Sequence, residues 1–237
     1  MRSYIIHMQG NQARAANVAQ LLDRLPQAQV VDAVNGRDVV AKGQVNCRQG
    51  DLHVPHYPFA LSPGEIGCFL SHRKCWEMIA NGDDAFGLIV EDDMVPDDTL
   101  WPSAMELVHQ HAGPDHMIRL PAKNREKPQS LVASHGGTCL FLPKRIGLQT
   151  VAQVIGRHAA RHLLAASETL DRPVDTFLQM HWIHGQTVHT LYPNGVSEET
   201  DALGGSTIQS RPTGGKLARE IKRAIYRTQV ALRPQRP

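Results

Sequence analysis

Three consecutive acidic residues, Glu91, Asp92 and Asp93, are the strongest chemical signal in the sequence. They follow the apolar run AFGLIV at 85–90, which is typical of a buried strand. Side chains alternate in direction along an extended segment, so we expect Glu91 and Asp93 to share a face and Asp92 to point away. Two carboxylates at a strand end can hold a hard divalent cation, and water molecules and diphosphate oxygens would complete its coordination shell. The alternative is an acidic, solvated turn.

Two further residues could take part in such chemistry. His72 shares a helix face with apolar residues, so it either packs in the core or orients an acid that binds a metal or donor phosphate. Asp175 follows a proline-restricted segment, where its carboxylate could act as a general base or as a helix N-cap. The residues alone leave both pairs of alternatives open.

Weaker signals lie late in the chain. Ser206 belongs to a Gly/Ser/Thr-rich loop at 204–207 that could bind phosphate through its amides and hydroxyls. One of His181, His184 and His189 could supply a third metal ligand, since imidazole tolerates Mn²⁺. No spacing identifies which of these histidines it would be, and each alone is more simply structural.

The cysteines do not predict a metal site. Cys47, Cys68, Cys75 and Cys139 form no CxxC pair, which favours free thiols in a reducing compartment. Cys68 and Cys75 are seven residues apart on one face of a helix, so we expect them to pack rather than to bind zinc.

The elements that must position these residues follow from periodicity. Strands are expected at 4–8 and 29–34, with a helix over 11–25 between them, and this β-α-β order favours a parallel sheet. Asn35-Gly36 predicts a turn, and 37–60 is expected to be a loop. Ser62-Pro63-Gly64-Glu65 predicts a helix start with a capping box. Further strands are expected at 117–120, 137–142 and 188–192, and helices at 100–111 and 146–166.

Composition and charge divide the chain unequally. The 237 residues are 41% hydrophobic and 20% charged, which is ordinary for a globular protein, and the beginning of the sequence has no secretory-signal pattern. Residues 211–237 carry eight Lys/Arg and one Glu, a charge of +7, while the rest totals −5. We therefore expect a main domain over 1–210 and a basic tail over 211–237.

The tail has helical periodicity. Leu217, Ile221, Ile225 and Thr228 recur at helical spacing among basic residues, which favours an amphipathic helix on an anionic membrane surface over a simple solvated helix. Nucleic acid is an unfavoured partner, because Tyr226 is the single aromatic residue of the tail that could stack on bases. The expected location is cytoplasmic, with the inner face of the inner membrane as the surface that the tail would contact.

The segment GEIGCFLSHRKCW at 64–76, followed by LIVEDD at 88–93, closely resembles glycosyltransferase family 25 of lipopolysaccharide biosynthesis. Weaker matches extend over 3–208, and the family's usual N-terminal pattern is altered here to His7-Met8 and Gln12-Ala13-Arg14. The resemblance implies an α/β fold of the GT-A-like, Rossmann type: a mixed, mostly parallel sheet flanked by helices. It also implies a UDP-sugar donor, Mn²⁺ (or Mg²⁺), and inversion at the anomeric carbon.

The resemblance also suggests roles for single residues. Glu91 and Asp93 would hold the metal and the donor, and Asp175 would be the base. We predict that Asp92, His72 and Ser206 also belong to the donor-binding site. The expected reaction is metal-dependent transfer of galactose from UDP-galactose to a lipooligosaccharide or related glycan acceptor. The alternatives are an inactive binding module of the same family and a nucleotide-sugar hydrolase.

Overall fold

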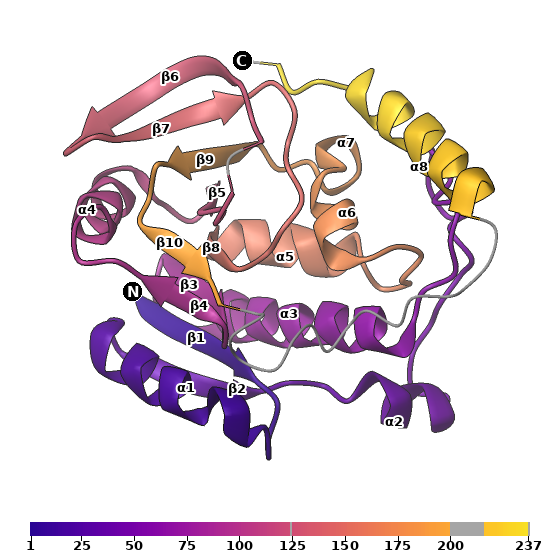
Figure 1. Cartoon of the computed structure of the whole chain (residues 1–237), viewed down its shortest axis with the longest axis horizontal. Helices are drawn as coiled ribbons and strands as arrows, with labels where there is room; N and C mark the ends of the chain where they lie inside the picture. Colours follow the sequence, from indigo (N-terminus) through magenta and orange to yellow (C-terminus); the bar gives the residue numbers. More distant parts are fainter. Residues whose placement is uncertain (124, 200–215, 237) are drawn as a thin grey trace.

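An eight-stranded sheet forms the centre of the molecule (Figure 1). The computed structural model describes residues 1–123, 125–199 and 216–236. Within these residues the strand order is β2-β1-β3-β8-β5-β9-β7-β6. Six strands run in one direction, and β7 and β8 run antiparallel to them. The mixed, mostly parallel α/β fold expected from the sequence is confirmed.

The elements have the following bounds. The sheet consists of β1 (Arg2–His7), β2 (Ala28–Asp32), β3 (Phe86–Glu91), β5 (Met117–Arg119), β6 (Pro128–His135), β7 (Thr138–Pro143), β8 (Ala152–Gly156) and β9 (Val188–Tyr192). A separate pair is formed by β4 (Met94–Pro96) and β10 (Val196–Glu198). The helices are α1 (Gln12–Arg24), α2 (Gly36–Ala41), α3 (Pro63–Asn81), α4 (Trp101–His111), α5 (Arg157–Ala165), α6 (Val174–Leu178), α7 (His181–His184) and α8 (Lys216–Ala231).

Helices cover both faces of the sheet (Figure 1). Alternation along β1 sends Tyr4 and Ile6 to one core and Ile5 to the other. The first core holds the apolar faces of α3 and α5, and the second holds those of α1 and α4. The long helix α3 begins with the predicted capping box: Ser62 Oγ accepts from the Glu65 amide, and the Glu65 carboxylate accepts from the Ser62 amide.

The predicted helix over 146–166 is wrong for its first part. Residues 152–156 form β8, which inserts antiparallel between β3 and β5, and the helix begins only at Arg157. All five β8 residues are buried, as expected for a central strand that is covered on both faces. The loop expected over 37–60 contains most of α2, and Asn35 accepts from the Arg37 amide at its N-cap.

The C-terminal helix α8 packs on the rest of the molecule. Tyr226 is 6% exposed, and its hydroxyl accepts a hydrogen bond from Arg172 at 3.1 Å. After the helix, the Gln235 side chain bonds both the amide and the carbonyl of Val188 in β9. The described part of the basic segment therefore packs against the preceding chain, at Arg172 just before α6 and at Val188 in β9. Within the part of the chain that the structure describes, no helix combines the length and apolar character needed to cross a bilayer.

Two glycines allow α2 and α3 to approach closely at the end of β2. A Cβ built on Gly67 would lie 2.5 Å from the Val34 carbonyl oxygen, and one on Gly36 would lie 1.7 Å from the Pro63 carbonyl oxygen. Ser71 on α3 reinforces this contact by accepting from the Val34 amide and donating to the Gly67 carbonyl. The backbone at 33–37 is thereby held against the first turns of α3.

We expect Gly67→Ala to lower the free energy of unfolding by about 1–3 kcal/mol, because the added methyl forces two backbone segments apart. Chemical denaturation followed by circular dichroism measures this change. A variant as stable as the natural chain would contradict the close approach of α2 and α3.

Candidate functional site

A cavity of about 420 Å³ lies where the first three parallel strands end. Ligands bind at the carboxyl ends of strands in open α/β sheets, and this cavity occupies that position next to β1, β2 and β3. The first turns of α1 and α3 complete its walls. Its lining residues are Ile6, Met8, Asn11, Arg14, Ala33, Val34, Asn35, Gly36, Arg37, Ser62, Pro63, Gly64, Gly67, Cys68, Ser71, His72, Glu91 and Asp92.

The three acids divide between this cavity and the interior. Glu91 is the last residue of β3, and Asp92 and Asp93 form a turn before β4. The prediction that Glu91 and Asp93 share one face of an extended segment is wrong, because the chain turns after Glu91. Glu91 and Asp92 line the cavity, whereas Asp93 is not among the described residues that do so.

Arg14 on α1 holds the two buried acids. Its Nη1 donates to Asp92 Oδ1, and its Nη2 lies 3.1 Å from Asp93 Oδ2. His7, at the end of β1, places Nδ1 2.8 Å from Asp92 Oδ2. Asp92, which was expected to point away from Glu91, lines the cavity beside it, and Asp93 is paired with a cation of the chain itself.

Glu91 is held by His72 and Thr150, and Gln153 in turn contacts His72. His72 Nε2 lies 3.3 Å from Glu91 Oε1, and Thr150 Oγ1 donates to the same oxygen at 2.5 Å. Gln153 Nε2 lies 2.9 Å from His72 Nδ1 and donates to it, which leaves the imidazole proton on Nε2. Burial acts to raise the pKa of Glu91, but hydrogen bonds from His72 and Thr150 outweigh it, so the pKa lies below its ordinary value.

His72 packs in the core, which was one of the two alternatives for it. Its side chain is fully buried beside Trp76, and its ring also contacts Glu91. Its role in orienting an acid that binds a metal or donor phosphate stays a prediction. Thr150 and Gln153 were missed by the sequence reasoning, because they come from the segment mistaken for one continuous helix.

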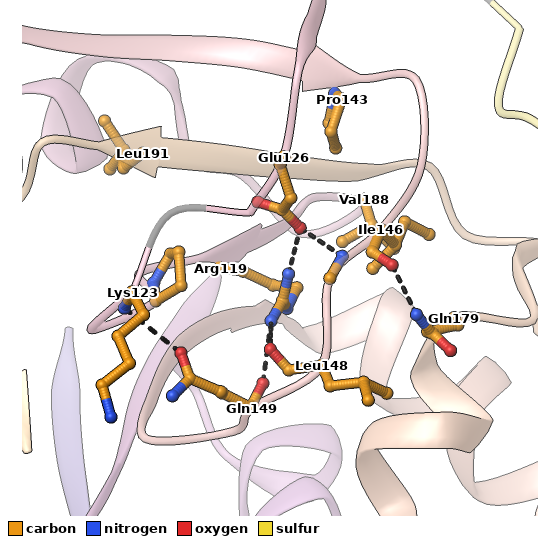
Figure 2. Close-up of polar contacts among 12 residues, drawn as sticks. Arg119, Lys123, Glu126, Pro143, Ile146, Leu148, Gln149, Gln179, Val188 and Leu191 are labelled. Carbon is orange, nitrogen blue, oxygen red and sulfur yellow. Dashed lines mark hydrogen bonds and ion pairs between the residues drawn. The ribbon is translucent and has the colours of Figure 1, made fainter. Parts of the chain in front are cut away.

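The loop before β8 contacts both Glu91 and Asp175, and its residues Leu148 and Gln149 are shown in Figure 2. Thr150 contacts Glu91, while the backbone amide of the preceding residue, Gln149, bonds the Asp175 carboxylate. Gln149 has a φ of 88°, a conformation that is unfavourable for a residue with a side chain. The buried Arg119 holds this backbone by donating to the Leu148 and Gln149 carbonyls at 2.6 and 2.9 Å.

The charge of Arg119 is balanced by Glu126. The Arg119 Nη1 donates to Glu126 Oε1, which also accepts from the Gly147 amide at 2.5 Å. Figure 2 shows the Arg119 guanidinium between Glu126 on one side and the Leu148–Gln149 backbone on the other. Neither Arg119 nor Glu126 carried any signal in the sequence.

Asp175 lies in the first turn of α6, half-buried, and accepts from the Thr176 amide at 2.6 Å. Burial raises its pKa, although the Thr176 hydrogen bonds and the charge of Arg119 oppose the shift. Burial also raises the pKa of the Cys68 thiol well above its usual value, and the charges of Glu91 and Asp175 add to that effect. Cys68 on α3 thus lies within electrostatic reach of both carboxylates.

The late histidines lie elsewhere in the fold. His184 bonds the Leu178 carbonyl at 3.2 Å, and burial lowers its pKa to about 4. His181 contacts the Arg233 carbonyl at 3.1 Å, and His189 packs against His116. The cavity lining of the described chain includes none of the three. Ser206 lies outside the described residues.

The whole site can now be compared with known proteins. The model of "Glycosyltransferase family 25 (LPS biosynthesis protein)" matches residues 1–178, which include the cavity, the acids and Asp175. The chain belongs to glycosyltransferase family 25. The matched residues contain seven of the eight sheet strands and all the polar contacts of Glu91 described above.

Curated relatives within family 25 have differing names. A Rattus norvegicus protein named "Probable inactive glycosyltransferase 25 family member 3" is 33% identical over 177 residues, which are 70% of this chain and 30% of that protein. A Drosophila melanogaster "Glycosyltransferase 25 family member" is 29% identical over 189 residues, 76% of this chain and 30% of that protein. The chain thus spans under a third of the length of these relatives.

A solved structure was also matched. The inositol-1-phosphate CTP transferase from T. maritima aligns over 94% of this chain and 95% of its own, with a TM-score of 0.41 and 13% identity. A similarity of this size is too low to support a functional inference for this member of family 25.

We expect Arg119→Met to lower the free energy of unfolding by about 3–5 kcal/mol, because it leaves Glu126 as a buried charge without its cation. The double variant Arg119→Met/Glu126→Met should recover part of that loss, since no charge is then stranded. Denaturation of both variants gives the coupling between the two residues. Equal losses in the single and double variants would contradict a buried ion pair that holds the loop.

Proposed function

We propose that the chain transfers a sugar, with galactose from UDP-galactose as the first donor to test, to a lipooligosaccharide or related glycan acceptor with inversion. Membership of family 25 supports the transferase class. The observation that carries the proposal is the cavity at the carboxyl ends of β1, β2 and β3, which Glu91 and Asp92 line. Asp175 is not among the described residues of the lining and is joined to Glu91 through the Gln149–Thr150 segment.

The chain's own groups suit binding of a nucleotide diphosphate. Arg37 is exposed at the cavity and offers a guanidinium to phosphate oxygens. The N-terminal turns of α1 and α3 contribute Asn11, Ser62 and Gly64 to the lining, and their backbone dipoles favour an anion there. Glu91 is fixed by His72 and Thr150 and leaves its second oxygen for a ligand hydroxyl or a cation.

Asp175 is proposed as the general base. It would take the proton from the acceptor hydroxyl as that oxygen attacks the anomeric carbon from the face opposite to the departing UDP. Burial raises the pKa of Asp175, which makes its carboxylate a stronger base than an exposed aspartate. The Gln149 amide and the Arg119 clamp behind it fix its position.

The proposed Mn²⁺ or Mg²⁺ fits the acids only in part. A hard cation prefers several oxygen ligands. Glu91 offers one carboxylate at the cavity, but Asp93 is buried against Arg14, and both Asp92 oxygens already face His7 and Arg14. The proposed reaction therefore has no step through a cation on Glu91 and Asp93. Assays with and without Mn²⁺ and Mg²⁺ test the ion separately.

The test is release of UDP from a panel of UDP-sugars, with and without glycan acceptors, Mn²⁺ and Mg²⁺. We expect acceptor-dependent release that falls about 10²–10⁴-fold in Asp175→Asn, the usual contribution of a general base, while donor binding is retained. Asp83→Asn, at an exposed acid away from the cavity, is the matched control.

The pH profile provides a second readout. The base must be ionised, and the pKa of Asp175 is raised, so activity should be lost on acidification at a higher pH than an ordinary aspartate would give. Donor binding without turnover would instead indicate an inactive binding module; the Rattus norvegicus relative is itself named probable inactive. Release that is independent of acceptor would indicate a hydrolase.

We also propose that α8 contacts an anionic membrane surface that carries the acceptor. While Tyr226 faces inward, Ile221 and Ile225 on the outer side are 52% and 54% exposed, next to the exposed Lys222 and Arg227. An apolar stripe among basic residues fits the interface of an anionic bilayer. Since α8 also covers Arg172, point substitutions on its outer side test this proposal more cleanly than deletion of the helix.

We expect Ile221→Ser/Ile225→Ser to weaken binding to vesicles that contain anionic lipid, measured by cosedimentation, and to leave the fold intact. Leu131→Ser/Val132→Ser, at exposed apolar residues of β6, is the matched control. Unchanged vesicle binding by the α8 variant would rule out membrane contact through this face.

A further inference from the structure

Three side chains of different chemistry converge at the inner wall of the cavity. Cys68 and His72 are one turn apart on α3, so they point the same way, and Glu91 meets them from the end of β3. One ligand atom from each, the thiol sulfur, an imidazole nitrogen and a carboxylate oxygen, lies within 4.8 Å of the other two. The cysteine spacing did not predict this cluster, because Glu91 lies 19 or more residues after Cys68 and His72 in the sequence.

We propose that Cys68 Sγ, His72 Nε2 and a carboxylate oxygen of Glu91 bind a divalent cation of the zinc class, with a fourth position open to the cavity. Zinc takes this combination of sulfur, nitrogen and oxygen ligands, and three protein ligands with one open position are typical of its exchangeable sites. Mn²⁺ and Mg²⁺ prefer oxygen and accept thiolate poorly. All three residues line the cavity, so a ligand in it could reach the open position.

The residue that contacts the far side of the His72 ring is of the kind that supports metal-bound histidines. Metal-bound histidines usually donate their second ring nitrogen to a fixed acceptor. The buried Gln153 amide faces His72 Nδ1, and its Oε1 has no hydrogen-bond partner in the described structure. Rotation of this amide would bring Oε1 to Nδ1, move the imidazole proton there and leave the Nε2 lone pair for the cation.

The other ligands are also supported. Thr150 donates to Glu91 Oε1 and keeps the carboxylate directed toward His72. Binding replaces the proton on Cys68 Sγ by the cation and releases that proton to solvent. The site does not depend on the proposed reaction: it needs Glu91, but neither Asp175 nor any sugar donor.

The test uses Co²⁺ as a spectroscopic substitute for Zn²⁺, titrated into the full-length reduced protein. We expect a near-ultraviolet thiolate-to-cobalt charge-transfer band and strong visible bands of a four-coordinate ion, both abolished by added Zn²⁺. Cys68→Ser should remove the charge-transfer band and weaken Zn²⁺ binding roughly 100-fold, and Cys139→Ser, four strands away from β3 in the sheet order, should keep both.

Two variants separate this site from its alternatives. Gln153→Leu keeps all three ligands but should weaken Zn²⁺ binding by about 10–100-fold, the usual effect of losing an outer partner. Asp93→Asn should keep the charge-transfer band, whereas a site built on Glu91 and Asp93 would lose the ion. Far-ultraviolet circular dichroism checks that each variant is folded.

The proposal is overturned if the natural chain gives no charge-transfer band, or if Cys68→Ser leaves it unchanged. These outcomes are independent of the UDP-release assay. An active transferase without the cobalt band would refute the metal site alone, and an inactive protein with the band would refute the transferase alone.

Discussion

The structure depends on how three consecutive acids are tolerated beside a buried strand end. Two adjacent buried carboxylates repel each other and lose hydration, so they require a cation in contact. Arg14 supplies that cation to Asp92 and Asp93 together, and Asn17 bonds the Asp92 and Met94 carbonyls of the same turn. This fixes α1 against the end of β3 and sets the direction of the turn, while Glu91 lines the cavity and is held by His72 and Thr150.

Local patterns predicted much of this fold. Short apolar runs located β1, β2, β3 and β9, and the Ser62–Glu65 capping box located the start of α3, because those signals are carried by adjacent residues. The failure at 146–166 has the opposite cause. A short strand buried on both faces has no alternation, and its apolar run AQVIG joins a helical one. Only its pairing with β3 and β5 distinguishes the two, and pairing is not local.

The sequence predicted which acidic residues belong to the candidate site, but it did not predict their contacts. Glu91, His72 and Asp175 were visible as chemical types near predicted element ends. Their partners Arg14, Thr150, Gln153 and Arg119 were not, because each contact joins distant parts of the sequence: 78 residues separate Arg14 from Asp92, and 59 separate Thr150 from Glu91. Side-chain alternation also failed at Asp93, since it holds only while the chain stays extended.

An acid motif is therefore not in itself a metal site. What decides the matter is which carboxylates keep an oxygen for an added cation once the chain's own cations are satisfied. In this chain Arg14 and His7 occupy the two aspartates, and the remaining glutamate is adjacent to a thiol and an imidazole rather than to a second acid. We infer that the acidic motif alone does not decide which ion this chain binds, because Arg14 on α1 already pairs with both aspartates.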